Sequence, residues 1–121
     1  MMIPKRSIAI VDDDGRVLES LANLLSSFGY HPRPFTSALD LLAADILPQV
    51  CCVITDREMP LMNGLELLAH IKRSEFPVPV IIITGKPSED TELFYANQGA
   101  AGFLRKPLDW DSLYCLLQRW C

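Results

Sequence analysis

The sequence lacks the features that would assign it to several common functional classes. No apolar run approaches the ~20 residues that a membrane-spanning helix needs. The N-terminal residues do not follow the order of charged, apolar and small residues that marks a secretion signal. Eleven basic and fifteen acidic side chains give a formal charge of −4, without a basic stripe that could neutralise nucleic-acid phosphates. We therefore expect a cytoplasmic protein that binds neither a membrane nor nucleic acid directly.

The four cysteines do not form a metal-binding pattern. Cys51 and Cys52 are adjacent within an apolar run, Cys115 and Cys121 lie near the end of the chain, and there is no Cys-x-x-Cys pair. Both histidines are isolated from the cysteines, so a zinc site has no support. We expect four reduced thiols that serve as small apolar residues.

The apolar residues alternate between two kinds of segment. Strand-sized runs, rich in Ile and Val and apolar on both faces, are typical of a parallel sheet covered by helices on both sides; they lie at residues 7–11, 50–54, 78–83 and 102–104. A further candidate strand, residues 31–35, contains two prolines and therefore belongs at a sheet edge. Amphipathic segments of helical length lie between and after these runs.

Several residues mark where these helices begin and end. Ser37, Ser88 and Asp109 are predicted N-terminal caps, and Gly29 and Gly99 are predicted ends. Because the chain of 121 residues has no repeat or linker, we predict a single domain over residues 1–121. The predicted fold class is α/β, a doubly wound, flavodoxin-like sheet of five parallel strands in the order 2-1-3-4-5 with five helices.

Polar side chains follow each buried strand of this predicted sheet. They are Asp12, Asp13 and Asp14 after the first run, Asp56 after the central one, Thr84 after the next, and Lys106 after the last. Because the carboxyl ends of parallel strands share one edge, where such folds bind ligands, these side chains are expected to converge. Asp14 is better explained as a helix start than as part of a metal site.

This combination of groups restricts the chemistry. Several neighbouring carboxylates repel one another, and a hard cation such as Mg²⁺ relieves the repulsion while keeping waters for a phosphate ligand. An ammonium group and a hydroxyl group would neutralise charge on a transferring phosphoryl group, and a carboxylate can itself be the nucleophile. Asp56, at the tip of the central strand, is the best-placed nucleophile.

Four motifs in this order identify a family resemblance. They are residues 10–14 (IVDDD), 56–64 (DREMPLMNG), 83–85 (ITG) and 102–107 (GFLRKP). Over about residues 6–119 the sequence resembles the receiver domain of bacterial two-component response regulators. Residues 35–38 (FTSA) and 82–85 (IITG) are most similar to the FixJ/NarL-like branch, whose members usually carry a C-terminal DNA-binding domain.

The resemblance implies a role for each site residue. A sensor histidine kinase would donate a phosphoryl group to Asp56, and Lys106, aimed by a cis bond to Pro107, would contact the phosphoryl oxygens. Mg²⁺, for which Mn²⁺ can substitute, would be held by Asp12, Asp13, Asp56 and the backbone carbonyl of Glu58. The domain would act as a switch and would catalyse only its own phosphorylation and dephosphorylation.

The resemblance also implies how the switch transmits its signal. Thr84 would bond the new phosphate, and Phe103 would turn into the space that Thr84 leaves. The changed surface would comprise about residues 88–98 and 101–118, which could also form a phosphorylation-dependent homodimer. The output would be transcription, through a DNA-binding domain absent from this chain.

Two alternatives and one finer hypothesis remain open from the sequence. A receiver-like scaffold would bind partners without phosphate, and a Mg²⁺-dependent phosphatase with an Asp nucleophile would use Glu58 as its general acid. Within the receiver hypothesis, Glu58 and Lys86 have opposite charges and flank the mouth of the site. We hypothesise that they pair and prolong the phosphorylated state.

Overall fold

Five parallel strands form the centre of the protein. The computed structural model describes residues 6–85 and 91–121, and the strands are ordered β2-β1-β3-β4-β5. Their bounds are β1 Ser7–Val11, β2 His31–Phe35, β3 Cys52–Asp56, β4 Val80–Thr84 and β5 Gly102–Arg105. The predicted fold class and strand order are therefore confirmed.

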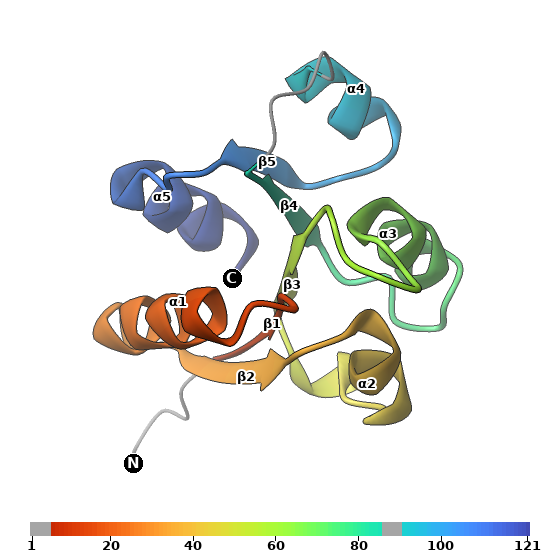
Figure 1. Ribbon diagram of the computed structural model, residues 1–121, viewed down its shortest axis with the longest axis horizontal. Coiled ribbons are helices and arrows are strands. Elements are labelled where there is room, and N and C mark those ends of the chain that lie inside the picture. Colours follow the sequence, from red (N-terminus) through yellow and green to blue (C-terminus); the bar gives the residue numbers. More distant parts are fainter. Residues whose placement is uncertain (1–5, 86–90) are drawn as a thin grey trace.

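Helices cover both faces of the sheet, as Figure 1 shows. On one face lie α1 (Gly15–Ser27) and α5 (Trp110–Trp120), which bury a cluster of Leu and Ile side chains against the strands. On the other lie α2 (Ala38–Ala43), α3 (Gly64–Lys72) and α4 (Glu92–Asn97). Among the described residues, no helix is both long and apolar enough to cross a bilayer.

Short polar side chains begin each α-helix, because they accept hydrogen bonds from backbone N–H groups that lack a partner in the first turn. Ser37 and Asp109 cap α2 and α5 as predicted, and Asp14 caps α1. Asn63 and Glu66 form a reciprocal capping box at the start of α3. The predicted cap Ser88 lies outside the described residues, and the described helix α4 is capped by Thr91.

The positions of the strands follow from their sequences. β3 and β4 are buried throughout and occupy the interior of the sheet. β2 contains Pro32 and Pro34, which cannot donate backbone hydrogen bonds, and it forms an edge. A short 3₁₀ helix, Leu47–Gln49, precedes β3 and was not predicted.

The cysteines differ from the sequence prediction. Cys51 and Cys121 form a disulfide, with their Cα atoms 5.4 Å apart and 70 positions apart in the chain. The expectation of four reduced thiols is therefore wrong for this pair, whereas Cys52 and Cys115 carry free thiols. The error arose because Cys51 comes just before β3 and Cys121 comes just after α5, and the fold brings these two positions together.

We predict that reducing this disulfide lowers the free energy of unfolding. Because the bridge closes a loop of 70 residues, it restricts the unfolded chain, and its loss should cost about 2–4 kcal/mol. Denaturant unfolding with and without dithiothreitol measures the difference. Cys121→Ser cannot form the bridge, so it should have the stability of the reduced wild type both with and without dithiothreitol. A wild-type stability that does not respond to the reductant would contradict the prediction.

Candidate functional site

The parallel register brings four strand ends to one edge of the sheet. Val11 pairs with Thr55, Asp56 with Ile83, and Thr84 with Arg105. Two hydrogen bonds extend the alignment beyond the strands: Arg57 N donates to Ile83 O at 2.8 Å, and Lys106 N donates to Thr84 O at 2.8 Å. Side chains that are far apart in the sequence therefore meet at the carboxyl edge.

Three carboxylates form the centre of this edge. Asp12 and Asp56 are 5% and 7% exposed, whereas Asp13 is exposed. Each contributes an oxygen that lies within 4.8 Å of the others. Asp14 is not in this group, and its side chain accepts a hydrogen bond from Arg16 N at the start of α1. The structure therefore agrees with the interpretation of Asp14 as a helix cap.

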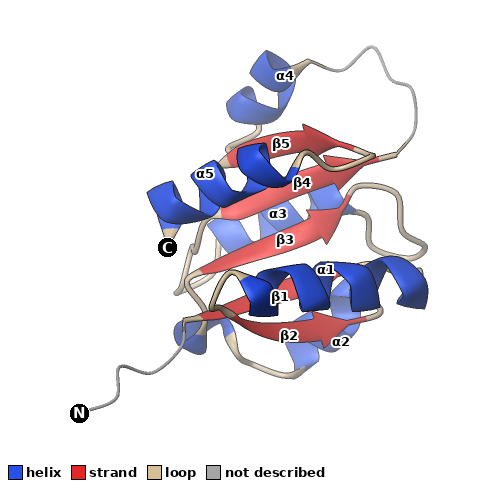
Figure 2. Cartoon of the chain, turned by 90° about the vertical axis from the view of Figure 1, so that its left-hand side faces the viewer, coloured by secondary structure: helices blue, strands red, loops and turns tan. Residues whose placement is uncertain are grey.

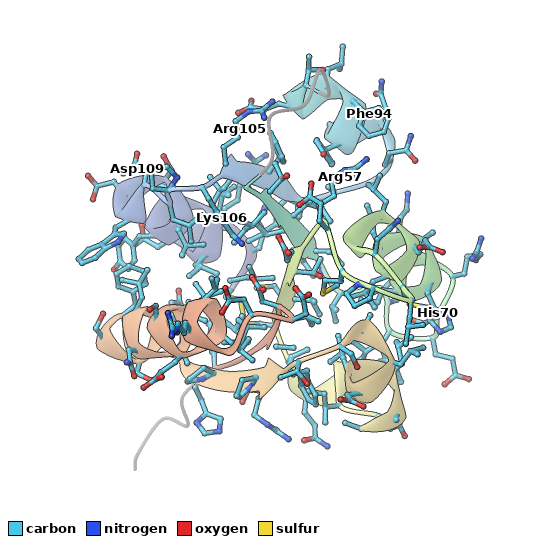
Figure 3. All side chains as sticks on the ribbon, viewed as in Figure 1. Arg57, His70, Phe94, Arg105, Lys106 and Asp109 are labelled. Atoms are coloured by element: carbon cyan, nitrogen blue, oxygen red, sulfur yellow. A yellow bond between two sulfur atoms is a disulfide. The ribbon has the colours of Figure 1, made fainter. Side chains whose placement is uncertain are left out.

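Lys106 reaches the acidic group from the connection between β5 and α5 (Figure 3). Its Nζ lies 3.3 Å from Asp12 Oδ2 and 3.5 Å from Asp56 Oδ1. Burial alone would lower the pKa of Lys106, but the charges of Asp56 and Asp12 outweigh it and raise the pKa. Lys106 is therefore a cation that faces two carboxylates, and its peptide bond to Pro107 is cis, as predicted.

Asp56 is the most perturbed carboxyl group of the site. Burial raises its pKa to about 6, and the negative charges of Asp12 and Glu58 add to this effect, while Lys106 opposes it. Repulsion and loss of hydration thus exceed the attraction of the single ammonium group. At neutral pH most Asp56 side chains are still ionised, and the site retains an excess of negative charge.

The acidic group fits a hard divalent cation. Its side-chain donors are all carboxylate oxygens, which Mg²⁺ and Mn²⁺ prefer, and they lie within 4.8 Å of one another. A cation there would offset the repulsion that raises the Asp56 pKa. Asp12, Asp13 and Asp56 are the side chains that could hold it. The Glu58 carbonyl as a further ligand stays a prediction.

Thr84 and Glu58 form a contact that the sequence did not reveal. Thr84 is 1% exposed, and its Oγ1 donates a hydrogen bond to Glu58 Oε1 at 2.6 Å. The hypothesised partner of Glu58, Lys86, lies outside the described residues. In the described part of the site, Glu58 therefore holds the hydroxyl of Thr84.

Phe103, the predicted switch aromatic, stacks on Tyr95. Their ring centroids are 4.2 Å apart with an interplanar angle of 11°, and Tyr95 is fully buried. The guanidinium group of Arg105 lies over the ring of Phe103, with Cζ 5.0 Å from the ring centroid. Sequence reasoning missed Tyr95, although an aromatic residue within a short helix is a signal for packing against the sheet. The stack links β5 to α4.

Gly64 lets α3 approach the end of β3 closely. A Cβ atom at this position would lie 2.5 Å from Asp56 O and 2.9 Å from Arg57 Cα. These are backbone atoms, which cannot rotate away as a side chain can. The glycine that ends the 56–64 motif therefore fixes the path of the backbone beside Asp56.

Sequence comparison identifies the family. The family model for the response regulator receiver domain matches residues 8–118. The transcriptional regulatory protein FixJ of Bradyrhizobium diazoefficiens is 34% identical over 119 residues, which are 97% of this chain and 57% of that protein. The DNA-binding transcriptional regulator NtrC of Proteus hauseri is 35% identical over 95% of this chain and 24% of its own length. The chain thus spans about half of the length of the first relative and about a quarter of the length of the second.

Structural comparison agrees with this assignment. The crystal structure of FixJ-N has a TM-score of 0.82 and 30% identity, and the match covers 97% of this chain and 94% of that one. A receiver domain protein from Clostridium thermocellum has a TM-score of 0.84 and 27% identity, over 94% and 92% of the two chains. The chain belongs to the response regulator receiver domain family, the phosphorylation-activated signalling domains of two-component systems.

Proposed function

We propose that this domain accepts a phosphoryl group on Asp56 from the phosphohistidine of a sensor histidine kinase. The observation that carries the proposal is the contact of Lys106 with both Asp56 and Asp12 at the carboxyl edge of the sheet. It supplies a carboxylate nucleophile beside a cation that can neutralise phosphoryl oxygens, which is what phosphoryl transfer requires.

Asp56 is suited to act as the nucleophile. With a pKa of about 6, it is mainly ionised at pH 7 but retains basicity, because its negative charge is poorly solvated. A carboxylate oxygen of Asp56 forms a bond to phosphorus while the bond from phosphorus to the donor's imidazole nitrogen breaks. The nitrogen keeps the electron pair, and the product is an aspartyl phosphate.

The other residues of the site have complementary roles in this proposal. Asp12, Asp13 and Asp56 would hold Mg²⁺, which would supply positive charge to the phosphoryl oxygens. Lys106 moves from its two carboxylate contacts to a phosphoryl oxygen, and its backbone bond to Thr84 O keeps it at the edge of the site. The domain catalyses only its own phosphorylation and dephosphorylation.

Thr84 and Phe103 would carry the change to the surface formed by α4, β5 and α5. Residues from all three elements line a hollow of about 480 Å³, with the Tyr95–Phe103 stack in its wall. Movement of Phe103 would reshape this surface, and a homodimer partner or an output domain would bind there. The similarity to full-length transcriptional regulators supports transcription as the output.

The first prediction from this proposal concerns the acceptor. Incubation with Mg²⁺ and a small acyl phosphate should add the mass of one phosphoryl group to the wild type but not to Asp56→Asn, as intact-mass spectrometry would measure. Asp14→Asn is the matched control, because asparagine also caps helices and Asp14 is outside the acidic group. A gain that persists in Asp56→Asn would place the acceptor elsewhere. No gain in the wild type from either an acyl phosphate or a phosphohistidine donor would favour the phosphate-independent scaffold.

A second prediction concerns pH in the presence of a chelator. The Asp56 pKa is raised from 3.8 to about 6 in the folded state, so the folded protein binds this proton more tightly than the unfolded chain does. Stability should therefore fall as pH rises from about 4 to about 6 and stay lower above that window. At pH 7.5, the free energy of unfolding of Asp56→Asn should be about 1–2 kcal/mol higher than that of the wild type. This is less than the whole pKa shift of Asp56 would give, because water screens the site.

Denaturant unfolding across pH measures this effect. Asp14→Asn should follow the wild-type curve, and Mg²⁺ at pH 7.5 should stabilise the wild type more than Asp56→Asn. Equal stability of the wild type and Asp56→Asn at pH 7.5 would contradict the argument that the carboxylate is destabilising there.

A third prediction concerns the hydrogen bond from Thr84 to Glu58. A phosphoryl group must compete with Glu58 for the Thr84 hydroxyl, and a hydrogen bond to a charged group at a partly solvated site is worth about 1 kcal/mol. Glu58→Ala should therefore bind a phosphoryl mimic such as beryllofluoride about fivefold more tightly, as titration would measure. In a Thr84→Ala background the substitution should have no such effect. An equal effect in both backgrounds would mean that Glu58 acts through its charge alone.

A further inference from the structure

A second cluster of reactive side chains lies at the opposite edge of the sheet from Asp56. The sulfur atoms of Cys51, Cys52 and Cys121 all lie within 4.8 Å of one another. Cys51 comes directly before β3, and Cys121 follows α5. Figure 2 shows the C-terminus near the tails of the strand arrows, away from the arrowheads that end at the acidic group.

The three cysteines are not equivalent. Cys52 is fully buried, and burial raises its pKa to about 12, so it stays a neutral thiol and a poor nucleophile. Cys51 and Cys121 are only partly buried, and they are the pair that is bonded. Exchange of the bridge onto Cys52 is therefore disfavoured, although its sulfur is near.

An open hollow of about 760 Å³ gives access to the bridge. Both bonded cysteines line it, together with Arg6, Arg119 and Trp120. None of the described residues that line this hollow is an aspartate or a glutamate. Arg6 and Arg119 are thus the charged side chains among the described residues that line the hollow, and the Arg119 guanidinium lies over the ring of Trp120, with Cζ 5.4 Å from the ring centroid. Guanidinium groups favour small molecules that carry carboxylates.

We propose that Cys51 and Cys121 form a thiol–disulfide exchange site for a small anionic thiol or disulfide of the glutathione class. Arg6 and Arg119 bind its carboxylates, and the exchange closes or opens a covalent tether between the end of α5 and the start of β3. This site is separate from the phosphoryl site, and its test does not depend on phosphorylation.

The exchange balances with glutathione disulfide as the oxidant. The thiolate of one protein cysteine attacks a sulfur of glutathione disulfide, which forms a mixed disulfide and releases one glutathione thiolate. The second protein cysteine, after losing its proton, attacks the protein sulfur of the mixed disulfide and releases the other glutathione thiolate. Two protein thiols are oxidised to the bridge, and one glutathione disulfide is reduced to two glutathione molecules. In the reduced form, the Ser7 carbonyl oxygen, 3.4 Å from Cys51 Sγ, can accept the thiol hydrogen.

The first experiment measures closure of the bridge in the full chain. Cys115→Ser removes the exposed thiol, which would otherwise react as well. The reduced protein is incubated in buffers of increasing ratio of glutathione disulfide to glutathione, quenched with acid, alkylated in denaturant and weighed. We expect three alkyl groups in reducing buffers and one, on Cys52, in oxidising buffers. Three alkyl groups under every condition, or a bridge that includes Cys52, would overturn the proposal.

The second experiment tests the bound molecule. When Cys121→Ser is added to the Cys115→Ser variant, glutathione disulfide should leave a stable glutathionyl group on Cys51. The thiol of Cys121, which would otherwise displace that group, is then absent. Arg6→Gln and Arg119→Gln should each slow this glutathionylation about threefold or more at low ionic strength, the effect expected for one exposed charge contact. Their reaction with the uncharged disulfide of 2-mercaptoethanol should not change.

Arg73→Gln is the matched control, since it removes an exposed cation at the end of α3, outside the hollow. It should react at the parent rate with both disulfides. If the Arg6 and Arg119 variants react with glutathione disulfide at the parent rate, the assignment of an anionic ligand is wrong. If they slow both reagents equally, they alter the fold around Cys51 and do not bind the ligand.

Discussion

Asp12 and Asp56 lose most of their contact with water at the carboxyl edge of the sheet, and their negative charges repel each other there. Lys106 offsets only part of this cost, since the Asp56 pKa is still raised to about 6. The arrangement persists because the surrounding backbone is fixed by strand register, by the bond from Lys106 N to Thr84 O, and by the close approach of Gly64. A buried core thus supports an edge whose excess of negative charge is unfavourable until a cation offsets it.

The sequence was sufficient to predict the fold and the grouping of the site residues, because both depend on local patterns and one general rule. Helix caps such as Ser37 and Asp109 act within a few residues, the prolines of residues 31–35 exclude a central position, and parallel strands must end at one edge. The Glu58–Thr84 bond and the Tyr95–Phe103 stack depend on side-chain rotamers and on the exact placement of α4, which periodicity does not determine. The Cys51–Cys121 bridge joins positions 70 apart, and spacing alone cannot indicate which chain ends the fold brings within 5.4 Å.

The contacts around Thr84 and Phe103 indicate why a phosphoryl group can change the domain. In the structure, Thr84 bonds Glu58 and Phe103 stacks on Tyr95, so that both groups already have partners. An aromatic stack contributes about 0.5–1.5 kcal/mol, whereas hydrogen bonds to a charged phosphoryl group contribute about 1.5–3 kcal/mol each. The phosphoryl contacts proposed for the site would have to offset both the stack and the Thr84–Glu58 bond, which is worth about 1 kcal/mol, so the two states would differ by only a small margin. Such a balance is what a reversible two-state element requires.

The two reactive sites lie at opposite ends of the same strand. Asp56 ends β3 and Cys51 precedes it, so about 17 Å of buried strand separates the two chemistries, and their charges interact weakly over that distance. Any coupling must instead pass through packed elements that both sites contact. Helix α5 is the element in question, because its last turn is tied to Cys51 by the bridge and its side chains form part of the surface next to Phe103. A closed bridge would restrict movement of α5 relative to β3, so that phosphorylation would act mainly through α4 and β5 while the bridge is closed.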